Sequence, residues 1–220
     1  MPRLCVPLLL SLVILAGSVP ASAEPLEFWA VLTNAQENPP ATPTLTSTAA
    51  PRPASFGTAF LTLNEAMTAL TFTATIFNID FTGSQTADTF DNLAAAHIHA
   101  SATVTPTTNA GVVFGFFGTP FNDNNPNDVV VTPFSSGVGG VISGKWDAPE
   151  GNNTTLTAQL PNILAGRSYL NFHTVQFPGG EVRGEIAPVP EPSTMVLVGL
   201  GTVGLIRRLR RRGRPGVLES

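Results

Sequence analysis

The sequence predicts an all-β protein, an antiparallel β-sandwich or Greek-key barrel of about 8–10 strands. Three observations predict it. Only 12% of the residues are charged and Lys145 is the single lysine, whereas solvated helices usually carry many charged side chains. Between residues 70 and 76, apolar side chains alternate with three threonines at the period of a half-buried strand. Clusters of Asn, Asp, Pro and Gly recur at the spacing of turns between short strands.

The remaining strands follow from the same alternation and from β-rich composition. They are expected at residues 26–33, 56–64, 70–76, 93–101, 111–117, 128–134, 141–147, 154–160, 168–175 and 181–186. One short helical turn is expected at 160–166, because Gly166 suits a left-handed helix cap. Proline-rich 39–55 and Asn/Asp-rich 119–128 are expected to be loops. The oxygen ligands of the second loop leave calcium as an alternative to a solvated turn.

The first 23 residues have the features of a secretory signal peptide, which adds a cleavable N-terminal helix to the fold. Arg3 precedes an apolar run at 8–15, and Ala21 and Ala23 form a small-x-small cleavage signature. Signal peptidase is therefore expected to cut before residue 24. The single cysteine, Cys5, lies in this segment, so the mature protein is expected to have no disulfide and no thiolate metal site.

The C-terminal segment, residues 188–212, combines three features of a sorting signal. They are the motif Pro190-Glu191-Pro192, an apolar helix at 195–206, and a basic cluster made of Arg207, Arg208, Arg210, Arg211 and Arg212. The combination resembles the PEP-CTERM sorting signal, which implies an exosortase-like processing enzyme. An apolar helix this short is marginal for a permanent span, so a transient contact with the inner membrane is expected, with the arginines on the cytoplasmic side. Residues 213–220 form a further basic and polar tail.

The segment between the two signals, residues 24–187, is expected to form one domain, because its length is typical of a single core. Residues 24–186 hold thirteen Asp and Glu and four Lys and Arg, a net charge of −9. Such a charge repels phosphate backbones. No nucleic-acid partner is expected.

Five sequence motifs of this domain, taken in their order along the chain, resemble a CHRD (chordin-like) domain. They are 34–40 (NAQENPP), 56–63 (FGTAFLTL), 96–100 (AHIHA), 169–174 (YLNFHT) and 178–184 (PGGEVRG). The resemblance spans roughly residues 26–187, nearly all of the mature domain. It implies an extracellular β domain and no established reaction.

All three histidines of the chain fall in these motifs, and two of them share one strand face. His97 and His99 alternate on a predicted strand, so their side chains point the same way. With His173 from another strand they form a set that zinc or copper can use, leaving an open coordination position. Alternatively, the rings hydrogen-bond to neighbouring strands and to Glu181 and Glu185.

The turn after His173 distinguishes two strand registers. A two-residue loop at 178–179 would place His173 opposite Gly184, whereas a three-residue loop would place it opposite Glu185. Only the second register would give the imidazole a carboxylate partner.

Three functions stay open at this level. The first is a non-enzymatic component of the cell envelope or extracellular matrix, exported across the inner membrane. The second is a metal-binding module or metalloenzyme built on the three histidines. The third is a domain that binds extracellular polysaccharide through exposed aromatics such as Trp29, Trp146 or Tyr169. The sequence contains no nucleophile elbow, P-loop or dinucleotide fingerprint, which favours a non-enzymatic role.

Overall fold

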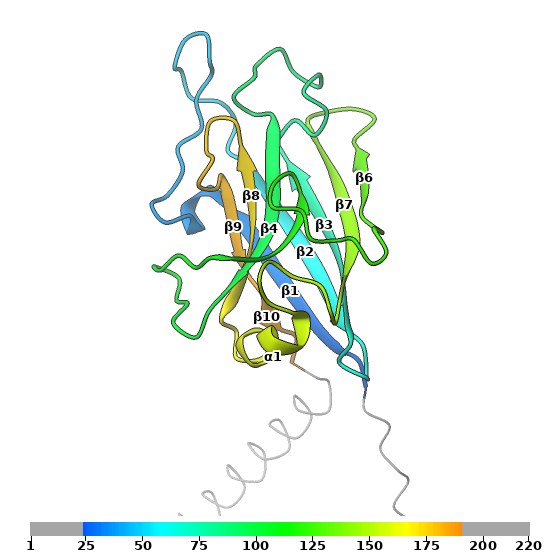
Figure 1. Ribbon diagram of the computed structural model, residues 1–220. Helices are drawn as coiled ribbons and strands as arrows, with labels where there is room; N and C mark the ends of the chain where they lie inside the picture. The colour runs from blue at the N-terminus through cyan, green and yellow to red at the C-terminus, as the bar shows by residue number, and fades with distance from the viewer. Residues whose placement is uncertain (1–23, 191–220) are drawn as a thin grey trace, which may run out of the picture.

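The computed structural model describes residues 24–190, which form one continuous sheet of ten antiparallel strands (Figure 1). The strands are β1 (Leu26–Thr33), β2 (Phe56–Leu63), β3 (Ala69–Phe77), β4 (Leu93–Ala100), β5 (Val112–Phe117), β6 (Val130–Pro133), β7 (Gly139–Asp147), β8 (Ser168–Thr174), β9 (Val182–Glu185) and β10 (Ala187–Pro188). Their order is β5-β4-β8-β9-β1-β2-β3-β7-β6, with β10 paired to β1. The predicted all-β fold is confirmed.

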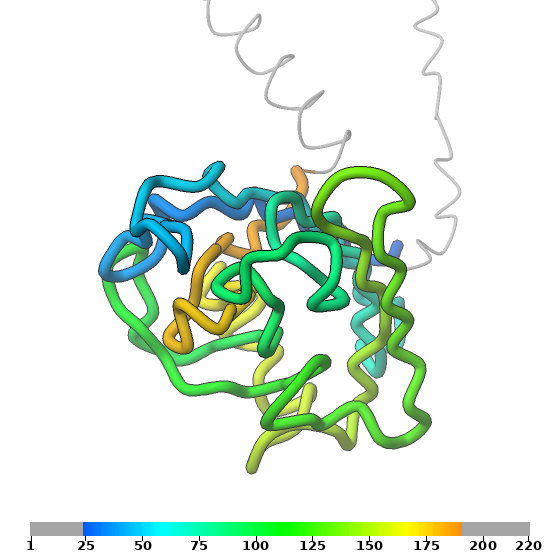
Figure 2. The backbone as a smooth tube through the Cα atoms, turned by 90° about the horizontal axis from the view of Figure 1, so that it is seen from above, coloured from blue at the N-terminus to red at the C-terminus, as the bar shows by residue number. Residues whose placement is uncertain are grey.

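The sheet curls around its core so that two halves face each other (Figure 2). The front half is β5-β4-β8-β9 and the back half is β1-β2-β3-β7-β6, and the two are joined where β9 pairs with β1. Across the core, Phe72 of β3 packs against Phe114 and Phe116 of β5, with ring centroids 6.5 and 4.6 Å apart. The fold thus has the facing layers of a sandwich and continuous hydrogen bonding along one side.

The strands of the two halves differ in how they are buried. Along β2 and β3, buried core residues alternate with exposed or half-exposed ones, as expected for a sheet with one solvated face. By contrast, β8 is buried at all seven of its positions, and β4 is buried from Ala95 to Ala100. A strand is buried on both sides only when other segments cover its outer face. Loops provide that cover, and they create the site described below.

One predicted strand is wrong, because residues 154–160 lie mostly in a helix, α1 (Leu156–Leu164). Thr155 suggested a strand because it is β-branched, but its side chain accepts a hydrogen bond from the first helical turn and caps the helix. The helical turn expected at 160–166 is therefore the end of a longer helix. Gly166 follows it with a φ of +66°, as its predicted cap role requires.

The remaining differences from prediction are small. A 3-10 helix η1 (Asn34–Gln36) follows β1, and the short strand β10 was not predicted. The segments 39–55 and 119–128 form loops, as expected. Within residues 24–190, no helix is long and apolar enough to cross a membrane. The predicted signal helix and the hydrophobic C-terminal helix lie outside the described residues.

Candidate metal centre

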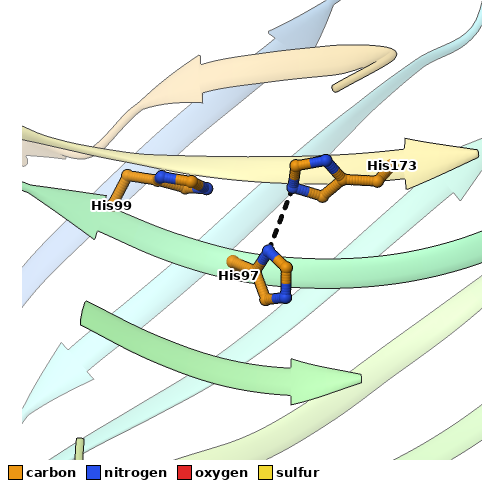
Figure 3. A group of neighbouring side chains, drawn as sticks. All are labelled: His97, His99 and His173. Atoms are coloured by element: carbon orange, nitrogen blue, oxygen red, sulfur yellow. Dashed lines mark hydrogen bonds between the residues drawn. The ribbon is translucent and has the colours of Figure 1, made fainter. Parts of the chain in front are cut away.

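The three histidines converge on the outer face of the front half-sheet (Figure 3). His97 and His99 project from β4, while Ile98 between them enters the core. On the neighbouring strand β8, His173 lies two residues from Asn171, the register partner of His97. One ring nitrogen from each histidine lies within 4.8 Å of the other two. The side chains are buried, with only 4 to 7% of each residue exposed.

Backbone carbonyl oxygens contact the ring nitrogens on the other side of each imidazole. His97 Nε2 lies 3.1 Å from the oxygen of Thr119, and His99 Nδ1 lies 2.9 Å from that of Ala110. His173 Nδ1 lies 3.0 Å from the oxygen of Pro178. A carbonyl oxygen only accepts hydrogen bonds, so a hydrogen bond at each contact requires the proton on that nitrogen. The covering loops thus turn the unprotonated nitrogens toward one another.

His97 and His173 together have fewer ring protons than their close contacts require. His97 Nδ1 lies 3.0 Å from His173 Nε2. These two rings make three close contacts, one with each other and two with carbonyls, but as neutral imidazoles they carry only two protons between them. One contact must therefore bring two lone pairs together unless a cation lies between the rings. A positive charge between the two rings would remove this conflict.

A proton is a poor candidate for that charge at neutral pH. Burial, together with the neighbouring rings of His173 and His99, lowers the pKa of His97 to about 3. Burial lowers the pKa of His99 to about 4 and also lowers the pKa of His173. All three rings are therefore neutral at pH 7, which is the form that coordinates metal ions.

Neither carboxylate expected beside the histidines is their partner. The register of β8 and β9 places Tyr169 opposite Glu185 and Phe172 opposite Val182. His173 consequently lies opposite Glu181, and both registers predicted for the turn are wrong, because its connection is longer than two or three residues. The side chain of Glu181 instead accepts hydrogen bonds elsewhere, from Arg52, Ser55 and Thr174.

Tyr169 and Arg183 stack in turn against the ring of His99. The ring of Tyr169 stacks on His99 with centroids 4.8 Å apart, and the guanidinium of Arg183 lies 3.7 Å from the Tyr169 centroid. The backbone nitrogen of Ala110 donates to the Tyr169 hydroxyl at 3.0 Å. Arg183, fully buried, donates to the carbonyl oxygens of Thr105 and Thr108. This stack therefore fixes the loop whose carbonyl orients His99.

Polar groups that the sequence interpretation did not single out extend this face. The carboxyl of Glu37 is 6% exposed, and burial raises its pKa to about 7. Its Oε1 and the Oδ1 of Asn171 have no hydrogen-bond partner among the described residues. Both atoms lie within 2.6 Å of the point that a Cβ on Gly180 would occupy, so only glycine fits there. The signal that could have identified Glu37 and Asn171 is their position in the family motifs.

The aromatic residues and the Asn/Asp-rich loop singled out in the sequence differ in how far they are exposed. Trp146 and Tyr169 are 0 and 2% exposed and cannot present a ring to a ligand, whereas Trp29 is 46% exposed. Asp123 of the presumed solvated loop is fully buried, and its carboxylate accepts from the backbone nitrogens of residues 128 and 129. In the described part of the chain, only the histidine cluster brings three metal-binding side chains together.

The residues predicted for export and sorting cannot be placed. Ala21, Ala23, Glu191, Pro192 and the arginine cluster lie outside the described residues, and Pro190 is the last described position.

Family models match both the β domain, including the histidine-bearing strands β4 and β8, and the C-terminal segment. The CHRD domain family matches residues 28–186, and the PEP-CTERM protein-sorting motif matches residues 188–212. The chain is therefore an exported extracellular protein that an exosortase-type system sorts. It belongs to the CHRD domain family. No curated protein and no solved structure shows significant similarity to it.

Proposed function

We propose that the CHRD domain of this exported protein binds one Zn²⁺ or Cu²⁺ ion through His97 Nδ1, His99 Nε2 and His173 Nε2. The observation that carries the proposal is the convergence of three neutral imidazoles whose opposite nitrogens all contact backbone carbonyls. Histidines that ligate metals typically donate their second N–H to such an acceptor. The buried, unpartnered Nε2 of His99 supports the same assignment.

The donor set limits the choice of metal. Three imidazoles without thiolate or carboxylate suit Zn²⁺ and Cu²⁺, whereas Ca²⁺ and Mg²⁺ require oxygen ligands. Nitrogens bound tetrahedrally at about 2.0–2.1 Å lie about 3.3 Å apart. The His97–His173 spacing of 3.0 Å is close to this value. On binding, the His99 ring moves toward the other two.

Three protein ligands leave one coordination position, which the surrounding loops shield from solvent. The small exposure of the three residues fits a metal that stabilises the domain in the envelope or extracellular matrix, or one that meets only small ligands such as water. In this proposal, the protein reaches that location after cleavage behind Ala23 and processing near Pro190.

Metal analysis of the purified protein tests the proposal directly. After incubation with Zn²⁺ or Cu²⁺ and dialysis at pH 7.5, we expect about one ion per chain. The His97→Ala/His99→Ala variant should retain less than a tenth of it, because two of three ligands are gone. As a matched control, Leu61→Ala removes a buried side chain from the back half-sheet and should keep the ion despite reduced stability. Absence of retained metal, or equal retention in the histidine variant, contradicts the site.

A further inference from the structure

A second, separate surface covers the outer face of the back half-sheet, where large apolar side chains are exposed. Phe60 is 65% exposed and Phe56 48%, followed by Trp29, Val31 and Phe77 at 46, 43 and 37%. Single exposed apolar residues are ordinary, but a contiguous group commonly marks a binding surface.

Strand register makes this group contiguous. Pairing across β1, β2 and β3 sets Trp29 beside Phe60, and Phe56 beside Phe77. The rings of Phe56 and Phe77 stack with centroids 4.9 Å apart. Four residues separate Phe56 from Phe60 on β2, about 13 Å along a strand. A ligand that touches both ends must therefore span about 13 Å, which suits an extended chain.

Hydroxyl groups alternate with the apolar side chains on the same surface, which we call the aromatic face. It consists of three rows across β1, β2, β3 and β7: Trp29, Phe60, Thr73 and Ser143; Val31, Thr58, Thr75 and Val141; Thr33, Phe56, Phe77 and Gly139. The next row begins and ends with the charged residues Glu27 and Lys145. The aromatic face itself carries no charge.

The lack of charge limits what binds there. The domain as a whole carries a net charge of −9, which disfavours nucleic acid, anionic lipid and close approach of a second copy. A neutral polymer meets no such repulsion. Sugar rings present apolar C–H faces that stack on aromatic rings and hydroxyl edges that bond to Thr and Ser. Thr58 and Thr73 are exposed and Thr75 is half-buried, so their hydroxyls lie at this surface, where a sugar can reach them.

We propose that the aromatic face binds a neutral extracellular polysaccharide. The sorting motif implies an extracellular or surface location, where a polymer outside the cell can reach this face. The site is independent of the histidine cluster, which lies on the opposite half of the sheet.

Affinity electrophoresis of the purified protein in gels containing hydroxyethylcellulose, dextran or the anionic polymer alginate tests the proposal. We expect at least one neutral polymer to retard the protein, and EDTA to leave the retardation unchanged. Phe60→Thr and Trp29→Thr should each weaken binding about tenfold, the effect of losing one stacked ring. Leu164→Gln on α1 replaces an apolar side chain off the face that is 41% exposed, close to the 46% of Trp29, and should bind like wild type.

Three results overturn the proposal. The first is the absence of retardation by both neutral polymers, and the second is retardation that Phe60→Thr and Leu164→Gln affect equally. The third is a dimer in sedimentation equilibrium that Phe60→Thr dissociates, because this outcome assigns the aromatic face to a second copy of the chain.

Discussion

The outer faces of the two half-sheets are built in opposite ways. On the front half, loops cover β4 and β8, and the buried face beneath them is polar, with histidines, a carboxyl and a guanidinium. On the back half, the ring of Phe134 packs against Phe77 at one edge of the aromatic face, but Phe60, Phe56 and Trp29 are exposed. The face is uncharged and has Thr and Ser hydroxyls between its rings. Under the two proposals above, the covered face holds an internal ligand and the open face binds an external one.

The cost of burying polar groups supports this distinction. Several buried atoms of the covered face have no hydrogen-bond partner in the described part of the chain: Asn34 Oδ1, Glu37 Oε1, His99 Nε2, Asn171 Oδ1 and Arg183 Nε. Each such atom costs about 1–3 kcal/mol if it stays unsatisfied. A face that retains five of them is a better candidate for a functional site than for a stabilising one.

The ion pair beneath the covered face gives the largest expected effect. Arg52, from the proline-rich loop, bonds to the fully buried Glu181. Arg52→Met leaves that carboxylate buried without a counter-charge, so we expect a loss of about 3–5 kcal/mol in the free energy of unfolding. Urea denaturation measures it. Arg52→Met/Glu181→Gln removes both charges and should recover part of the loss; an equally unstable double variant would show that packing, and not charge, dominates.

Acid should destabilise the metal-free protein through the same face. The folded-state pKa values of His97, His99 and His173 are lowered, so below pH 6.5 the unfolded chain binds more protons at these three residues than the folded chain does. Glu37 and Asp123 oppose this, because their pKa values are raised to about 7 and about 6 and they hold protons in the folded state. The three histidine shifts outweigh these two opposing carboxyl shifts, so the free energy of unfolding should fall as the pH is lowered from 6.5 to 4.5.

Two comparisons sharpen the pH prediction. Glu37→Gln removes one opposing group, so the slope of unfolding free energy against pH should become steeper. Bound Zn²⁺ keeps the histidines unprotonated and should raise stability above pH 6 in wild type but not in His97→Ala/His99→Ala. A flat profile from pH 6.5 to 4.5 would contradict the buried neutral state of the rings.

The sequence predicted the back half-sheet better than the front, for a physical reason. Strands β2 and β3 have one solvated face, so their alternation is visible in the residues themselves. The convergence of the histidines was also predictable, because alternation aligns His97 with His99 and the motifs suggested a common site. What the sequence could not show is that the loops ending near Ala110, Thr119 and Pro178 supply the hydrogen-bond partners.

The predicted register after β8 and the predicted strand at 154–160 were wrong for the same reason. In both places, tertiary contacts override the local sequence pattern. The length of the turn after β8 decides whether His173 faces Glu181 or Glu185, and the Pro-Gly-Gly sequence suggested a tighter turn than the observed one. At α1, the threonines before Leu156 have high strand propensity but serve to cap a helix.

Removing one hydroxyl tests the link between the covering loops and the metal. Tyr169→Phe keeps the ring stacked on His99 but deletes the acceptor for the Ala110 nitrogen, loosening the carbonyl that orients the imidazole. We expect about tenfold weaker Zn²⁺ binding in a chelator competition assay. Ser55→Ala, which removes a hydroxyl bonded to Glu181 and not to the loop, should leave the affinity unchanged. If both variants weaken Zn²⁺ binding equally, the effect of Tyr169→Phe comes from general destabilisation and not from the loop at Ala110.

The smallest effect is expected on the aromatic face. Phe60 is 65% exposed, and threonine suits a strand equally well, so Phe60→Thr should change the free energy of unfolding by less than about 0.5 kcal/mol. Phe72→Ala, in the core behind it, should cost about 3–5 kcal/mol in the same urea titration. A loss above about 1.5 kcal/mol for Phe60→Thr would mean that the ring stabilises the sheet. A negligible loss leaves the exposed ring without a folding role, as a side chain that serves ligand binding requires.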